Sequence, residues 1–184
     1  MVLKLLLIAL GLTVGVSPAR AKGDTPSTND FNWLVGTWNV ERDYLPNTDQ
    51  HREMNGTISC DLAVSDAYYR CDYHLSSANR APVHEVVYLN YNAIYGRYET
   101  LWISAGWPIK NTMSSIPGPS TRELVWTSSF LIENGVTESV ESQWSFLQDG
   151  NLQRRTLIRT SNNEPDTWLH WMTEIIYLSN SENQ

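Results

Sequence analysis

Positive charge is scarce in this sequence. The 184 residues contain 13 Lys and Arg against 20 Asp and Glu; without residues 1–21, which hold Lys4 and Arg20, the counts are 11 and 20, a net charge of −9. An acidic surface repels the phosphates of nucleic acids and of anionic lipids. We therefore expect neither nucleic acid nor an anionic membrane surface as a partner.

Motifs of common enzyme classes are also missing. The sequence has no Gly-x-Ser-x-Gly nucleophile elbow, no phosphate-binding loop, no zinc motif and no dinucleotide fingerprint. The four histidines, His51, His74, His84 and His170, do not have metal-ligand spacing. We expect no metal site, and we expect His74 and His84 to be exposed.

The sequence has one long apolar run, Leu5 to Val16, which follows Lys4 and precedes Ala19-Arg20-Ala21. This run is too short to span a bilayer as a helix, and the small-x-small triplet fits signal peptidase. We expect residues 1–21 to be a signal peptide and residues 22–29 a flexible leader. The mature protein is then secreted or periplasmic, with no membrane span.

Cysteine is limited to Cys60 and Cys71. In an exported chain such a pair favours a disulfide over a metal site. The two lie on alternating segments, Met54 to Leu62 and Tyr69 to Leu75, separated by a turn near Ser65-Asp66. Folding a hairpin there places Cys60 opposite Cys71, with Ile58 opposite Tyr73 and Leu62 opposite Tyr69. Asn55-Gly56-Thr57 is a glycosylation sequon, which matters only in a eukaryotic secretory pathway.

Helical periodicity is absent apart from a short turn at Asp30 to Val35, which Asp30 is placed to cap. Alternating strands follow instead. The first is Trp38 to Tyr44, and after the cysteine hairpin come residues 82–92, 95–105, 122–133, 136–147, 151–160 and 167–178, with a broken edge strand near 109–114. Turn signals include Asn134-Gly135, Asp149-Gly150 and the stretch from Asn162 to Pro165. We predict an all-β domain over residues 30–179, an antiparallel up-and-down barrel of nine or ten strands, followed by a tail at 180–184.

The opening segment of the domain, Leu34-Val35-Gly36-Thr37-Trp38, predicts a tight entry at Gly36 and a Trp38 that plugs the barrel floor. Together with Leu89-Asn90-Tyr91-Asn92 and Tyr98-Glu99-Thr100-Leu101-Trp102, it resembles a bacterial lipocalin-like family of unknown function within the calycin barrels. The chain departs from that family where Gly-Tyr-Asp is usual, and it lacks the Arg often found at the end of the last strand. Arg154 or Arg159 is then a candidate to stack on Trp38.

Aromatic residues are plentiful, with 8 Trp and 9 Tyr. Spread over many strands, they either fill a core or line a cavity for an apolar or flat ligand. The residues that we expect to bind a ligand are Tyr69, Tyr73, Trp102, Trp126, Trp144 and Trp168.

These observations leave three functions open for an exported barrel whose oligomeric state is also left open. The first is binding of a small hydrophobic or amphipathic molecule in an aromatic-lined cavity. The second is a cyclase, isomerase or dehydratase that uses acid-base residues, for which the candidates are Glu85, Glu99, Glu174 and His170. The third follows from the resemblance, since nitrobindins bind haem iron through a His near the C-terminal strand, a position that His170 matches.

Overall fold

The computed structural model describes residues 25–46, 48–78, 80–105, 107–118, 123–131, 136–160 and 168–178. These residues form one short 3₁₀ helix and ten strands, which confirms the all-β prediction. In chain order the elements are η1 (Thr28–Leu34), β1 (Gly36–Tyr44), β2 (Arg52–Ala63), β3 (Tyr68–Ser77), β4 (Arg80–Asn92), β5 (Arg97–Ser104), β6 (Trp107–Ser115), β7 (Glu123–Leu131), β8 (Thr137–Phe146), β9 (Leu152–Thr160) and β10 (Leu169–Leu178).

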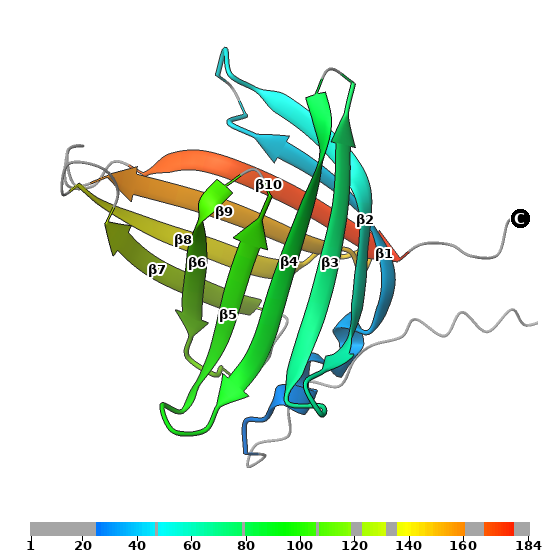
Figure 1. Ribbon diagram of the computed structural model, residues 1–184, viewed down its shortest axis with the longest axis vertical. Helices are drawn as coiled ribbons and strands as arrows, with labels where there is room; N and C mark the ends of the chain where they lie inside the picture. Colours follow the sequence, from blue (N-terminus) through cyan, green and yellow to red (C-terminus); the bar gives the residue numbers. More distant parts are fainter. Residues whose placement is uncertain are drawn as a thin grey trace, which may run out of the picture.

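The strands form a closed antiparallel barrel in which each strand pairs with its neighbours in sequence, and β10 pairs with β1 to complete the ring (Figure 1). Closure removes the free edges of the sheet. Because side chains alternate along each strand, one face of every strand lines the lumen, as the burial of alternate residues in β3 shows.

The β2–β3 hairpin has the register that the side-chain period predicts. Cys60 pairs with Cys71, and the two form a disulfide. Ile58 pairs with Tyr73, and Leu62 pairs with Tyr69. The connecting turn places Val64, Ser65 and Asp66 at positive φ, between 52° and 63°. Leu62 differs from the expectation in one respect, because its side chain is 42% exposed at the end of the strand.

The helix η1 closes the end of the barrel at which β1 begins; we call this the closed end (Figure 1). Phe31 is completely buried, with its ring edge-on to Tyr98 at 4.8 Å. Trp38 is buried, and its indole N–H donates to the carbonyl of Leu34 at 2.8 Å. Gly36 has φ +125°, a conformation that side chains rarely adopt, and this turns the chain from helix into strand.

Asp30 acts differently from the cap that the sequence predicts. It lies inside the helix, and its carboxylate accepts a hydrogen bond from the backbone N–H of Ser27 at 3.0 Å. The same carboxylate accepts the hydroxyl of Tyr98, which ties the helix to β5. The helix therefore begins two residues earlier than predicted, at Thr28.

The predicted broken edge strand is strand β6, which belongs to the barrel wall; its register with β5 shifts between Trp102 and Ser104. Its ladder with β7 is short: in the parts of both strands that the structure describes, the one pair is Ser114 with Thr127, whereas β7 and β8 share nine pairs. Among the described residues, fewer pairs therefore join β6 to β7 than join β7 to β8. Several predictions fall outside the described residues, namely the signal peptide, residues 22–24 of the leader, the Asn134-Gly135 turn, the stretch from Asn162 to Pro165, and the tail.

Candidate functional site

Four charged side chains meet inside the lumen. They are Arg42 on β1, Glu85 on β4, Glu174 on β10 and Arg154 on β9, and we call them the charged layer. Arg42, Glu85 and Glu174 are at most 2% exposed. Burying charges is costly unless they are paired, so their partners decide what the layer can do.

The pairing joins both sides of the barrel. Arg42, Glu174 and Arg154 are directly opposite one another on adjacent strands, so they form a row along one side of the lumen. The Nε of Arg42 donates to Glu174 at 2.5 Å, and the Nε of Arg154 lies 3.1 Å from the other carboxylate oxygen. From β4, three strands away around the ring, Glu85 accepts two further hydrogen bonds from Arg42 at 3.0 and 2.8 Å.

Aromatic side chains complete the surroundings of the layer. The indole N–H of Trp102 donates to Glu85 at 3.2 Å. Arg42 donates to the hydroxyl of Tyr44 at 2.6 Å, and its guanidinium lies 5.5 Å from the centre of the Tyr73 ring. Arg42 thus uses four of its five N–H donors: two on Glu85, one on Glu174 and one on Tyr44.

The electrostatics keep Glu85 ionised. Burial by itself raises the pKa of this carboxyl, but the charge of Arg42 and its two hydrogen bonds outweigh burial, so the pKa lies below its usual value. Burial lowers the pKa of Arg42, but Glu174 and Glu85 together raise it well above its ordinary value. Burial, reinforced by Glu174, raises the pKa of Tyr73 to about 12. The layer contains two positive and two negative groups, so it has no net charge.

A cavity of about 50 Å³ lies in the lumen against the charged layer. It is lined by four tryptophans from four strands, Trp102, Trp126, Trp144 and Trp171, together with members of the layer. This volume holds a few water molecules, whereas pockets for drug-sized ligands measure about 300–1,000 Å³. A larger ligand therefore requires some of the lining side chains to move.

Tyr44 and Trp171 are two aromatic residues at the end of the barrel opposite η1, which we call the far end. Tyr44 is the last residue of β1, and Trp171 lies near the start of β10. Their rings are edge-on to each other at 5.5 Å, and both line the cavity. Their contact is a natural place for the cavity to open.

The predicted ligand-binding residues divide into three groups. Trp102, Trp126 and Trp144 line the cavity. Tyr69 is buried at the closed end, where its hydroxyl donates to Asn32, and Tyr73 packs beneath Arg42. The third case is Trp168, which does not line the cavity; the guanidinium of Arg159 lies over its ring, 4.9 Å from the ring centre.

Arg159 and Arg154 do not stack on Trp38, contrary to the prediction. Arg159 lies over Trp168, and Arg154 is paired with Glu174 in the lumen. Arg154 pairs with Glu174 rather than stacking because a buried, unpaired carboxylate costs far more free energy than a cation–π contact contributes.

The acid-base candidates divide between the lumen and the outer wall. Glu85 and Glu174 belong to the charged layer. Glu99 lies on the outer wall, where it accepts hydrogen bonds from Asn92 and Arg97 at 2.9 and 2.8 Å. It therefore does not point inward, although alternation allowed that orientation.

His170 also lies on the outer wall. A β-bulge interrupts the β9–β10 register between His170 and Met172, so the two side chains no longer share the face that strict alternation assigns to them. The Nε2 of His170 is 2.8 Å from the hydroxyl of Thr173, and Thr173 lines an outer hollow with Glu41. Burial and the nearby charge of Arg155 lower the pKa of His170. This imidazole does not reach the lumen cavity.

Sequence reasoning missed Arg42, Tyr44 and Trp171 as site residues. Arg42 shares an otherwise apolar face with Trp38 and Val40, and a charged residue on such a face is the signal that could have identified it. Trp171 enters the lining because the bulge turns it inward beside Met172. A bulge of this kind has no signature in the alternation of residues.

A larger hollow of about 590 Å³ lies on the outside of the barrel, over β4, β5 and β6. It contains Tyr88, Leu101 and the Arg97–Glu99 ion pair, in which Arg97 is 41% exposed. At such an exposed position water already solvates both charged groups. We place the candidate site in the lumen, because that is where charges and indoles are withdrawn from water.

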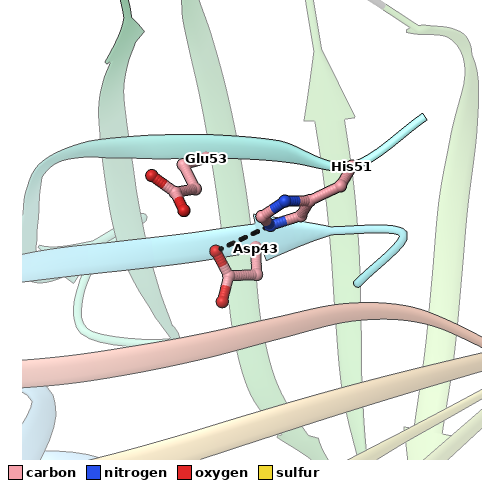
Figure 2. Close-up of side chains that lie close together, drawn as sticks. All are labelled: Asp43, His51 and Glu53. Carbon is pink, nitrogen blue, oxygen red and sulfur yellow. Dashed lines mark hydrogen bonds and ion pairs between the residues drawn. The ribbon is translucent and has the colours of Figure 1, made fainter. Parts of the chain in front are cut away.

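One cluster of potential metal ligands lies on the outer surface at the far end (Figure 2). Asp43 and Glu53 pair across β1 and β2, and His51 precedes β2. One ligand atom from each lies within 4.8 Å of the others, and the imidazole of His51 is 3.4 Å from Asp43. All three are solvent-accessible, and an exposed ion pair explains the arrangement without a metal. His74 and His84 are exposed as predicted, with stacked rings 4.6 Å apart.

Comparisons with known proteins identify the fold. No protein-family model and no curated protein matches the chain. Among solved structures, the S-type phycobiliprotein lyase CPES from Guillardia theta is similar, with a TM-score of 0.59 and 14% identity. The match covers 85% of this chain and 95% of the lyase. The chain therefore has a lipocalin-like, calycin-type fold. Within the described residues, no helix is both long and apolar enough to cross a membrane.

Proposed function

We propose that this barrel binds a small, flat, amphipathic molecule in its lumen, between the charged layer and the far end. The observation that carries the proposal is the ring of four indoles, Trp102, Trp126, Trp144 and Trp171, around a cavity whose floor is polar. Flat apolar walls with a few fixed polar groups are the usual composition of ligand pockets.

The size of the cavity determines how binding proceeds. At about 50 Å³ the cavity admits no ring-containing molecule as it stands. Separation of Tyr44 from Trp171 lengthens the cavity toward solvent without disturbing β1 or β10, because both side chains lie near strand ends. Binding is then coupled to a side-chain movement at the far end.

We also propose that the protein acts outside the cytoplasm, after removal of residues 1–21. The Cys60–Cys71 disulfide supports this location, since disulfides persist in oxidising compartments. The resemblance to phycobiliprotein lyases supports a bilin as one class of ligand worth testing.

Catalysis and haem binding stay predictions with less support. Arg42 holds both Glu85 and Glu174 in hydrogen bonds, so neither carboxylate is free to exchange a proton with a substrate. His170 lies on the outer wall, so a haem bound through it would sit outside the indole-lined cavity. Binding in the lumen therefore has the better structural support.

Tryptophan fluorescence tests the proposal. The full chain, expressed in an oxidising compartment, is titrated with palmitate, retinol, biliverdin and haemin. We expect saturable quenching by at least one of them, because four of the eight tryptophans line the cavity. A Trp171→Ala variant is expected to associate several-fold faster, since the contact with Tyr44 no longer has to break.

Trp33→Phe is the matched control. Trp33 lies in η1 at the closed end, where its ring is edge-on to Phe146 at 4.9 Å. Its replacement removes one indole without touching the cavity, so affinity is expected to stay unchanged. Absence of saturable quenching by every compound, in protein that is folded by circular dichroism, contradicts the proposal.

A further inference from the structure

Arg154 has hydrogen-bond donors that the charged layer does not use. Its Nε faces Glu174 at 3.1 Å. Within the part of the chain that the structure describes, neither Nη atom of Arg154 makes a hydrogen bond. These atoms are nevertheless not buried, because the buried side-chain atoms without a partner include the Nε of Arg154 but neither Nη. The Nη side of the guanidinium is therefore accessible to a small molecule.

The accessible side of this guanidinium faces the lumen cavity. Arg154 lines the cavity, whereas Glu174 does not, so the Nε edge is turned toward Glu174 and the Nη edge toward the cavity. The side chain of Arg154 is 15% exposed. Its charge also lowers the pKa of Glu85 on β4, the strand farthest from β9 around the ring. The guanidinium thus extends from its own wall toward the middle of the lumen.

A second donor lies beside Arg154 on the same part of the wall. Ser142 and Thr156 are directly opposite each other on β8 and β9, and they are the neighbours of the Trp144–Arg154 pair on the same face. Both are 2% exposed, and both line the cavity. Thr156 donates to Ser142 at 3.2 Å, and the O–H of Ser142 has no acceptor among the described residues.

The two donors are close enough to serve one atom of a guest. Arg154 and Thr156 are two residues apart on β9, which corresponds to about 7 Å along the strand. The side chain of Arg154 is long enough to span this distance, and Ser142 lies directly across from Thr156. One guest oxygen in the cavity can therefore accept from an Nη of Arg154 and from the hydroxyl of Ser142.

The charged layer restricts what this guest can be. Arg42 and Arg154 together neutralise Glu85 and Glu174. An anionic guest would leave one negative charge uncompensated in the lumen, and a cationic guest would meet donors where it needs acceptors. An uncharged acceptor loses only its water partners, and the two donors replace them.

We propose that Arg154 and Ser142 form a subsite for the uncharged carbonyl oxygen of an aromatic ketone. An Nη of Arg154 and the O–H of Ser142 donate to this oxygen, and the indole of Trp144, directly opposite Arg154 in the wall, packs against the ring system. The subsite rests on the proposed lumen-binding function and specifies the chemical class of its ligand.

Three probes with one ring system separate the alternatives. They are 2-acetylnaphthalene as the ketone, 2-isopropenylnaphthalene, in which a CH₂ group replaces the carbonyl oxygen, and 2-naphthoate as the anion. Binding to the full, disulfide-bonded chain is followed by tryptophan fluorescence. We expect the ketone to bind about tenfold or more tightly than either other probe, because only the ketone gives both donors an acceptor without adding charge.

Each other outcome overturns the subsite. Equal binding of the ketone and the alkene shows that the donors do not reach the oxygen, and it leaves the lumen-binding function standing. Tightest binding of 2-naphthoate shows that the lumen compensates a negative charge. Absence of binding by all three probes also overturns the subsite, whereas the titrations with palmitate, retinol, biliverdin and haemin decide the lumen-binding function separately.

Two variants test the named donors. Arg154→Met removes the guanidinium and keeps an unbranched side chain, and it is expected to weaken binding of the ketone about tenfold. Ser142→Ala removes the hydroxyl and is expected to weaken it several-fold. Both variants are expected to leave binding of the alkene unchanged. Arg155→Met, next to Arg154 on β9 but exposed, is the matched control and is expected to change neither affinity. Equal loss of both affinities in Ser142→Ala shows a packing role and overturns the proposal.

The carbonyl band of the bound ketone provides a readout in the unaltered protein. This matters because Arg154→Met also removes a partner of Glu174 and so alters the charged layer. A hydrogen bond from a guanidinium weakens the C=O bond. In infrared spectra of ¹³C=O-labelled 2-acetylnaphthalene, the band of the bound probe is expected at lower frequency than in hexane, and Ser142→Ala is expected to move it part of the way back. A band at the hexane frequency, or one that Ser142→Ala leaves in place, overturns the proposal.

Discussion

The Arg42→Met variant is the sharpest test of the charged layer. The substitution keeps an unbranched apolar side chain of similar length but removes the guanidinium that donates to Glu85 and Glu174. Glu174 keeps its ion pair with Arg154 at 3.1 Å. Glu85 keeps the indole N–H of Trp102 and loses its cation.

The expected cost follows from which charge is left alone. Removing one partner of a buried ion pair costs about 3–5 kcal/mol, chiefly because the other charge stays buried and unpaired. For a domain of this size each kcal/mol corresponds to about 2–4 °C in Tm, so the melting temperature is expected to fall by about 6–20 °C at pH 7. The double variant Arg42→Met/Glu85→Leu removes the stranded carboxylate, and it is expected to recover most of this loss.

The loss is also expected to depend on pH. In the wild type the pKa of Glu85 in the folded state lies below its unfolded value, which is about 4.3. The ionised Glu85 therefore contributes to folding stability at pH values above the unfolded pKa. This contribution is lost as the pH falls through the lower folded pKa. In Arg42→Met, burial acts on Glu85 without its cation and raises the pKa, so the penalty is relieved at low pH. The difference in unfolding free energy between wild type and Arg42→Met therefore shrinks as the pH falls below about 5.

Urea denaturation, followed by circular dichroism at pH 7 and pH 4 with the disulfide intact, measures both effects. Arg97→Met is the matched control: Arg97 pairs with Glu99 on the outer wall, where it is 41% exposed, and loss of such a pair costs about 0–1 kcal/mol. A loss below 1 kcal/mol for Arg42→Met at pH 7, or one that is equal at both pH values, would refute the reasoning.

Three further predictions concern other parts of the barrel. Gly56→Ala is expected to lower stability by about 1–3 kcal/mol in urea denaturation, because a Cβ there would lie 1.9 Å from the backbone carbonyl oxygen of His74; a loss below 0.5 kcal/mol counts against this packing. Replacing both Cys60 and Cys71 by Ala is expected to cost about 3 kcal/mol, since the bond closes a short loop with a sequence separation of 11; an unchanged denaturation midpoint would show that the unfolded chain is not constrained by it. Tyr73 is expected to ionise at about pH 12 in absorbance titration at the phenolate band, and because this folded pKa exceeds the unfolded value of about 10, stability is lost as the pH rises from 10 toward 12; a Tyr73→Phe variant that still shows the late titrating component would assign it elsewhere.

The side-chain period determined a large part of the architecture. Alternation along the strands gave the register of the β2–β3 hairpin, including the Cys60–Cys71 pair, because a slip of one residue would expose the entire apolar face. The same period predicted an antiparallel meander of nine or ten strands, and the barrel has ten. It also placed Trp102, Trp126 and Trp144 on strands that line the cavity.

The same period failed where the backbone departs from regular pleating. The bulge between His170 and Met172 moves His170 to the outer wall and brings Trp171 to the lumen, and a bulge depends on hydrogen bonding to β9 rather than on residue types. Glu99 was open to either face, and its partners Arg97 and Asn92 hold it outside.

What the sequence determined by itself was thus local: which residues alternate, which two cysteines meet, and where the chain turns. Closure of the barrel decided the site. Only closure places β1 beside β10, so that Arg42 faces Glu174, and only the curvature of the ring brings Glu85 within 3 Å of the same guanidinium. The physical reason is that a buried cation takes its partners from whatever strands surround it, and those neighbours are set by the tertiary ring and not by distance along the chain.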